Sequence, residues 1–150
     1  MDIDIIRVRQ DGIARCIRRI QTKAGIPYDL FVEDYDAQDV VVLNLERAVQ
    51  QAVDVATHVL AETAEPVPET MRDAFDSLRR IGVLTEPTAD RMMKAVGFRN
   101  TAVHAYQRID WQIVHSIVTD RLGDFSDFIR EVDAYLARNE AGGQHGDLSE

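Results

Sequence analysis

The chain has 150 residues, of which 45% are hydrophobic and 29% charged, and its formal net charge is −9. This length suits one domain with a hydrophobic core. The acidic balance argues against general nucleic-acid binding, because affinity for a phosphate backbone rests mainly on lysine and arginine.

The only cysteine, Cys16, excludes an internal disulfide, which agrees with a reducing compartment. No apolar run reaches the roughly 20 residues of a membrane span, and the acidic start lacks the basic segment of a signal peptide. We therefore predict a soluble, cytoplasmic protein without membrane contact.

Basic residues nevertheless gather in two islands. Residues 7–23 hold six lysines and arginines against one acid, and residues 90–108 hold four against one. Acids concentrate instead at 33–39, 62–76 and 110–150. Such islands either bind an anionic ligand or form ordinary solvated helix faces, and charge alone leaves both interpretations open.

The first predicted helix covers residues 5–24. Ile13, Ile17 and Ile20 recur at the spacing of one amphipathic stripe. Gly25 follows as a stop signal. We expect this helix to pack one face against the rest of the protein.

A longer helical pattern starts near Asp36 and fades before Pro66. Its wide apolar face predicts a position near the centre of a helical bundle. A third helix is expected with Pro68 in its first turn and Gly82 just after its end.

Thr85 and Asp110 are the expected N-caps of a fourth and a fifth helix. Gly123 is expected to bend or interrupt the fifth helix, which continues to about Arg138. Residues 139–150 are Gly-rich, polar and without periodicity, which predicts a disordered tail. The fold class is therefore all-α, an up-and-down bundle of about five helices over residues 1–138.

Four chemically capable residues lie within one short segment: Arg99, Asn100, His104 and Tyr106. RNA cleavage needs a group that moves protons near neutral pH, for which histidine is the usual choice. It also needs a fixed cation that stabilises charge on the phosphate, as arginine does with its forked donors. Asn100 can orient either group, and Tyr106 can donate to a phosphate oxygen.

Helical geometry does not bring all four together. Asn100 and His104 share a helix face, as do Arg99 and Tyr106, but His104 and Tyr106 point apart on an ideal helix. Either the helix is irregular at this point, or a second copy completes the site, and we favour the second copy. The residues alone also permit a packing role for His104 and a simple ion pair for Arg99.

The segment resembles the Arg-Asn-x-x-x-His-x-Tyr signature of the HepT family of HEPN-domain toxins. The resemblance extends to residues 35–39, 43–48, 54–59, 71–75 and 96–98, and covers roughly residues 30 to 132. The order and spacing of these segments make it specific, whereas Arg-x4-His alone occurs often by chance.

The resemblance implies a HEPN-like homodimer that cleaves RNA without a metal or other cofactor, with Arg99 and His104 as the catalytic pair in a shared cleft and tRNA as a candidate target. It also implies a cognate antitoxin similar to MntA, a minimal nucleotidyltransferase that transfers AMP from ATP to the motif tyrosine, which corresponds to Tyr106. A larger hetero-oligomer of toxin and antitoxin is a further expectation. The modification would add bulk and negative charge beside the catalytic pair.

An aspartate and a histidine on the long central helix allow two interpretations. Asp54 and His58 are four residues apart, so the carboxylate can orient the imidazole. Asp54 either supports the active site or belongs to an ordinary helix-face pair. The histidines lack the spacing of a zinc site.

Two other functions compete with the toxin interpretation. The chain could be a catalytically silent module that binds nucleotide or presents Tyr106 to a nucleotidyltransferase. It could also be a helical interaction protein without chemistry.

Overall fold

The computed structural model describes residues 2–148 and the side chains of residues 2–140. Over these residues the chain is helical, and no strand interrupts the helices. The α-helices are α1 (Ile3–Gln21), α2 (Tyr28–Phe31), α3 (Tyr35–Leu60), α4 (Met71–Arg80), α5 (Glu86–His104), α6 (Trp111–Ser116) and α7 (Gly123–Leu148). A 3-10 turn, η1 (Tyr106–Arg108), follows α5, and a π-helical segment, η2 (Ile117–Arg121), joins α6 to α7. The predicted all-α fold is confirmed, with more and shorter pieces than the five helices expected.

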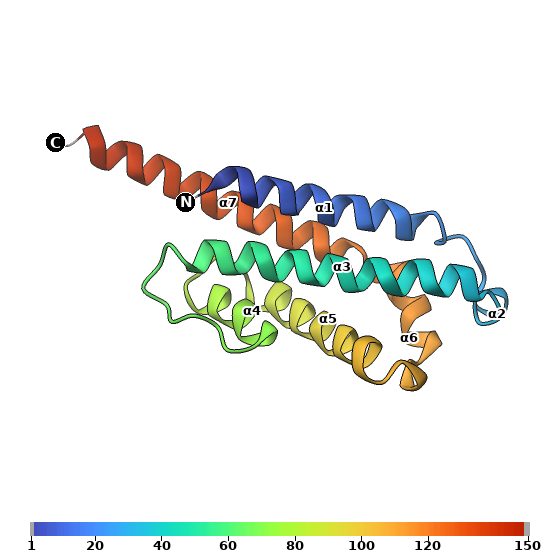
Figure 1. Ribbon diagram of the computed structural model, residues 1–150. Coiled ribbons are helices and arrows are strands. Elements are labelled where there is room, and N and C mark those ends of the chain that lie inside the picture. Colours follow the sequence, from blue (N-terminus) through green and yellow to red (C-terminus); the bar gives the residue numbers. More distant parts are fainter. Residues whose placement is uncertain (1, 149–150) are drawn as a thin grey trace.

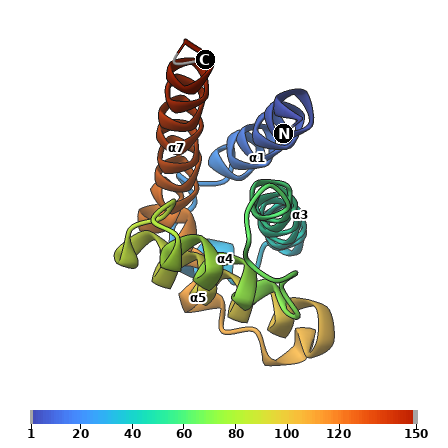
Figure 2. The same cartoon turned by 90° about the vertical axis from the view of Figure 1, so that its left-hand side faces the viewer.

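The long helices α1, α3, α5 and α7 run alternately up and down (Figure 1). Helix α3 lies between α1 on one side and the α4–α5 pair on the other, and the view along the bundle shows α7 beside α1 (Figure 2). The predicted central position of α3 is therefore confirmed. None of the helices formed by residues 2–148 is long and apolar enough to cross a membrane.

The core is built from the apolar stripes that the periodicity predicts. Ile13 and Ile20 of α1 are fully buried against α3. Phe75 of α4 meets Phe128 of α7 edge to face, with ring centroids 5.6 Å apart. Ile113 of α6 is one exception among the large apolar side chains, because it is 54% exposed.

Two polar side chains, Gln38 and Asp133, tie helices together at the two ends of the bundle. The buried side-chain amide of Gln38 donates to the carbonyls of Phe31 and Val32 at 3.0 and 2.9 Å, so it holds the short helix α2 against α3. At the opposite end, Asp133 of α7 accepts from Arg7 at 2.6 Å and from Gln10 at 2.8 Å, which ties α7 to α1.

The predicted helix starts are confirmed at two caps and shifted at a third. The side chains of Thr85 and Asp110 accept hydrogen bonds from the first turns of α5 and α6. Helix α4 begins at Met71 and is capped by Thr70 rather than started at Pro68, because a threonine hydroxyl accepts the hydrogen bond from the Asp73 N–H.

At the carboxyl end, α7 continues to Leu148 and extends past the N-terminus of α1 (Figure 1). The domain boundary expected at Arg138 thus falls inside α7 and not at its end. The last two residues of the expected tail, 149 and 150, lie outside the described residues.

Candidate active site at the end of α5

Helix α5 ends at His104, in the middle of the motif. Ala105 departs from helical geometry, with φ −148° and ψ 53°, although its N–H still donates to the Thr101 carbonyl at 2.8 Å. The chain then makes the 3-10 turn η1, closed by the Arg108 N–H on the Ala105 carbonyl at 2.8 Å. Tyr106 therefore no longer follows the helical spacing of Arg99. Of the two alternatives drawn from the sequence, the irregular helix is present, and completion by a second copy stays a prediction.

Arg99 keeps its charge available for a ligand. Its side chain is half-buried, and Nη1 donates only a long hydrogen bond, 3.5 Å, to Oδ1 of the neighbouring Asn100. No ion pair to Arg99 exists among the residues that the structure describes. The simple ion pair that the sequence permitted for Arg99 is therefore absent from this part of the chain, and the guanidinium retains donors for an incoming anion.

His104 is the last residue of α5, and its side chain is exposed. Within residues 2–140 it makes no side-chain hydrogen bond. The alternative of a packed, hydrogen-bonded histidine is therefore wrong for this position. The imidazole is placed where a substrate can reach it.

Tyr106 is 44% exposed and is held by two contacts. Its hydroxyl donates to Oδ1 of Asp39 on α3 at 3.3 Å. Its ring meets Trp111 edge to face, with centroids 6.0 Å apart. Partial burial raises the pKa of Tyr106 above its ordinary value, and the negative charge and hydrogen bond of Asp39, with Glu46 beyond it, raise it further. At neutral pH the site therefore presents a neutral phenol beside an acidic patch of α3.

Asp39 is the member of this site that the sequence did not single out. It lies 67 positions from Tyr106, and only folding brings the two side chains together. The one available signal was its membership of the segment 35–39 that carries part of the family resemblance.

Asp54 and His58 lie away from the motif. Asp54 accepts from Gln50 at 3.2 Å, and its carboxylate lies 3.7 Å from Nε of Arg9 on α1. Asp54 lines a hollow between α1 and α3 that contains Arg15, Arg19 and Arg47 but no motif residue. The described contacts pair Asp54 with Arg9 rather than with His58, and do not bring either residue to Arg99.

Apolar side chains lie exposed around the motif. Val103 precedes His104 and is 46% exposed, and Leu43 is 44% exposed. Leu43 is four residues from Asp39 on α3, so both point from one helix face toward the side where Tyr106 lies. Single exposed apolar side chains are common on protein surfaces, and these two offer apolar area beside the motif.

No group of three or more histidine, cysteine, aspartate or glutamate side chains that could hold a metal ion occurs in the described part of the chain. His115 is used structurally, because its Nε2 lies 2.9 Å from the carbonyl oxygen of Ile26 and its ring packs against Tyr28 and Phe31.

The family model described as ribonuclease HepT-like matches residues 13–132, which include the whole motif. The chain belongs to this family. The mRNA nuclease HepT of Shewanella oneidensis is 38% identical over 131 residues, or 87% of this chain and 98% of that protein. The tRNA nuclease HepT of Aphanizomenon flos-aquae is 26% identical over 88% of this chain and 90% of that protein.

Solved structures agree with this HepT-like assignment. The chain superposes with a TM-score of 0.82 on the tri-AMPylated HEPN toxin of Shewanella oneidensis in complex with its MNT antitoxin, at 37% identity over 89% of this chain and 99% of that one. YutE, a cytosolic protein of unknown function from Bacillus subtilis, matches with a TM-score of 0.79 at 15% identity, which shows a shared fold alone. The family predicted from the motif is therefore confirmed.

Proposed function

We propose that this protein is the RNA-cleaving toxin of a toxin–antitoxin pair and that Arg99 and His104 are its catalytic residues. One observation carries the proposal: within the described residues Arg99 has no ion pair, and it lies with an exposed His104 in the last two turns of α5, in a chain 38% identical to an mRNA nuclease. The names of the two nuclease relatives divide between mRNA and tRNA. We expect tRNA to be cleaved, and mRNA is the alternative target.

The chemistry follows from the two side chains. In RNA cleavage without a metal, the ribose 2′-oxygen attacks the adjacent phosphorus while the bond to the 5′-oxygen breaks. His104 takes the 2′-hydroxyl proton or protonates the leaving 5′-oxygen. Arg99 stabilises the negative charge that develops on the phosphate oxygens. Asn100, which already accepts from Arg99, positions the guanidinium.

Two copies of the chain make a more complete site than one. A single protomer offers one Arg99 and one His104, whereas a two-fold axis beside the motif supplies a pair of each. The exposed side chains of Leu43 and Val103 give such an axis apolar surface to bury. We therefore propose a homodimer with the two motifs facing one cleft.

Tyr106 is the proposed switch. Its phenol oxygen attacks the α-phosphorus of ATP, an O–P bond forms, pyrophosphate leaves, and the phenol proton is released. The partner that holds the ATP is a nucleotidyltransferase similar to the MNT antitoxin found with the tri-AMPylated relative. AMP on Tyr106 places a negative charge and a large group beside Arg99 and His104, which repels RNA phosphate and fills the approach. The toxin and antitoxin can then persist as a hetero-oligomer.

The nuclease is tested by expressing the full chain without a partner and by incubating the purified protein with total RNA and with a tRNA pool, with and without EDTA. We expect growth arrest and cleavage that EDTA does not prevent. Arg99→Ala and His104→Ala should each reduce cleavage by about 100-fold or more. Arg108→Ala is the matched control, because Arg108 is an exposed arginine of the adjoining turn. Normal growth together with intact RNA would rule out the nuclease function.

The switch is tested by intact-mass measurement after co-expression with a nucleotidyltransferase similar to the MNT antitoxin of the Shewanella oneidensis relative. We expect AMP additions that disappear in Tyr106→Phe, together with loss of RNA cleavage in the modified protein. Adducts on another residue would contradict the role of Tyr106. Adducts without any cleavage by the unmodified protein would favour the silent partner module instead.

A further inference from the structure

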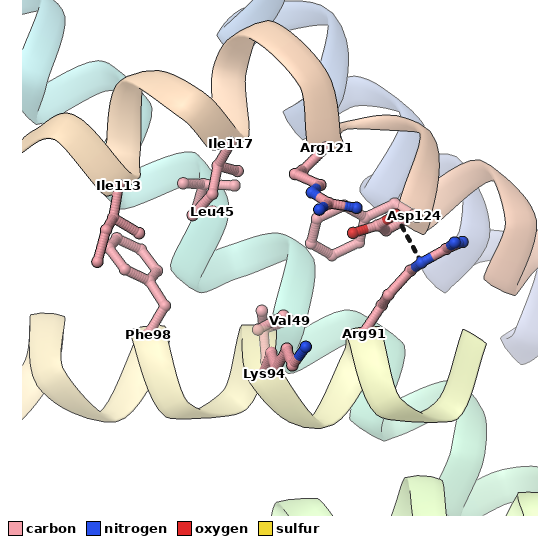
Figure 3. A pocket seen from close by; sticks show the side chains of 11 residues that line it. Leu45, Val49, Arg91, Lys94, Phe98, Ile113, Ile117, Arg121 and Asp124 are labelled. Atoms are coloured by element: carbon pink, nitrogen blue, oxygen red, sulfur yellow. Dashed lines mark ion pairs between the residues drawn. The ribbon is translucent and has the colours of Figure 1, made fainter. Parts of the chain in front are cut away.

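A second candidate site lies beside α5, apart from Arg99, His104 and Tyr106. A cavity of about 290 Å³ opens between α3, α5, the η2 segment and the start of α7 (Figure 3). This volume is at the lower end of the range of small-molecule pockets. None of Arg99, His104 and Tyr106 lines it.

One end of the cavity is apolar. Phe98 of α5 points toward Ile113 of α6, and Leu45 and Ile117 lie next to this pair (Figure 3). Small Ala95 leaves room in the wall between the helices. The apolar lining of this end favours the binding of a hydrocarbon group.

The other end is cationic. Arg91 and Arg121 line it with a single carboxylate, Asp124, and Lys94 lies beside Val49 between the two ends (Figure 3). The ion pairs of Arg91 are long, with Nε 3.8 Å from Asp124 and Nη1 3.6 Å from Asp127. Lys94 and Arg121 have no ion pair within the described residues. The positive charge of the three basic side chains that line the cavity therefore exceeds the negative charge of its one carboxylate.

The wall that carries Ile117 and Arg121 is π-helical. Such wide turns are rare and occur frequently at functional sites. The π-helical turn places the side chains of Ile117 and Arg121, four positions apart, in the wall of the same cavity.

We propose that this cavity binds a small amphipathic anion, with a carboxylate head on Arg121, Lys94 and Arg91 and a short hydrocarbon tail between Phe98 and Ile113. Arg91 and Phe98 are seven residues apart on one helix, which spans roughly 10 Å, the length of a medium-chain acyl group. A nucleobase fits less well, because the lining contains no uncharged hydrogen-bonding side chain to pair with its edges. The site is separate from the motif, so the inference does not depend on RNA cleavage.

The test is calorimetric titration of the full chain with octanoate, with octanol as a tail without charge and acetate as a head without tail. We expect saturable binding of octanoate, one per chain, with Kd below about 1 mM. Octanol and acetate should each bind at least about tenfold more weakly.

Four variants locate the site. Ala95→Leu fills the apolar end and should abolish binding, and Arg121→Gln should weaken it about tenfold. Arg18→Gln, an exposed arginine of α1, is the matched control and should leave affinity unchanged. Asp124→Asn removes the only carboxylate of the cavity and should tighten binding. Circular dichroism checks that each variant is folded.

The proposal is overturned if octanoate does not bind, or if it binds equally well to folded Ala95→Leu. Equal losses in Arg121→Gln and Arg18→Gln would indicate unspecific charge attraction and would also overturn it. A second copy of the chain is the other possible occupant. Dissociation of a dimer by Ala95→Leu, without octanoate binding to the intact protein, would assign the cavity to that interface.

Discussion

Arg99 carries the proposed catalysis through the shape of its guanidinium as well as through its charge. A guanidinium donates two parallel hydrogen bonds to a phosphate, whereas an ammonium acts as a point charge. We predict that Arg99→Lys lowers the rate of RNA cleavage by about 10- to 100-fold while RNA binding changes little. Single-turnover kinetics with a labelled RNA measures both quantities. Arg108→Lys on the adjoining turn is the control, and a near-normal rate in Arg99→Lys would show that charge alone suffices.

The contact between Asp39 and Tyr106 adds to the effect of burial on the pKa of the proposed modification site. Burial, the Asp39 carboxylate and Glu46 all raise the pKa of Tyr106, since each disfavours the tyrosinate anion. Asp39→Asn removes a negative charge, so we predict that the pKa of Tyr106 falls toward its ordinary value. Ultraviolet titration against Tyr106→Phe as the blank measures it. The matched control is Asp36→Asn on the same helix, and an unchanged pKa in Asp39→Asn would show that burial alone causes the shift.

Residue types along the sequence identified most of the candidate site, but not the residues that folding brings to it from other helices. Arg99, His104 and Tyr106 are chemically distinctive and close in sequence, so they could be chosen without a structure. Asp39 could not be chosen, because nothing in the local pattern links it to Tyr106. The same limit applies to Asp54, whose contact with Arg9 on another helix competes with the local pairing to His58 that helical spacing suggested.

The start of α5 shows how a helix that carries the site is anchored. The Thr85 hydroxyl accepts from the Thr88 N–H at 3.5 Å, and the Thr85 N–H donates to Glu131 of α7 at 2.7 Å. Glu131 also accepts from the Thr88 hydroxyl. We predict that Thr85→Ala lowers the free energy of unfolding by about 1 kcal/mol, the usual cost of a lost N-cap.

Urea denaturation followed by circular dichroism measures the effect of Thr85→Ala. Thr57→Ala is the control, because Thr57 is exposed in the interior of α3, where alanine is the better helix former. An equal loss of stability in both variants would contradict the capping role of Thr85.

Helix starts were easier to predict than helix ends. Thr85 and Asp110 carry short polar side chains that compete for the first N–H groups of a helix, so their positions mark starts directly. The end of α5 at His104 has no glycine or proline directly after it to mark the stop, and the residue types from Ile117 to Arg121 do not distinguish a π-helical turn from an α-helical one. The four-residue helix α2 is too short for periodicity and is held by Gln38.

At the scale of the whole molecule, net charge opposes the proposed dimer. Each copy carries −9, so two copies repel one another, and salt screens that repulsion. We predict that the dimer tightens as salt is raised from low to physiological ionic strength, and that Leu43→Glu weakens it at every salt concentration. Sedimentation velocity measures the dissociation constant. Val67→Glu is the control, because Val67 is 84% exposed in the loop between α3 and α4. If both variants weaken the dimer equally, Leu43 does not lie in the dimer interface.

A mixed dimer distinguishes a cleft that uses residues of both copies from a dimer in which each copy holds a complete site of its own. Arg99→Ala leaves His104 in place, and His104→Ala leaves Arg99, so each homodimer lacks one group entirely. A mixed dimer holds one Arg99 and one His104, contributed by different copies across the two-fold axis. We predict that co-expression of the two variants with different tags, followed by sequential purification of the mixed dimer, restores RNA cleavage well above that of either variant alone. If each catalytic pair must instead come from one copy, the mixed dimer stays as inactive as its parents, because neither chain then carries both groups.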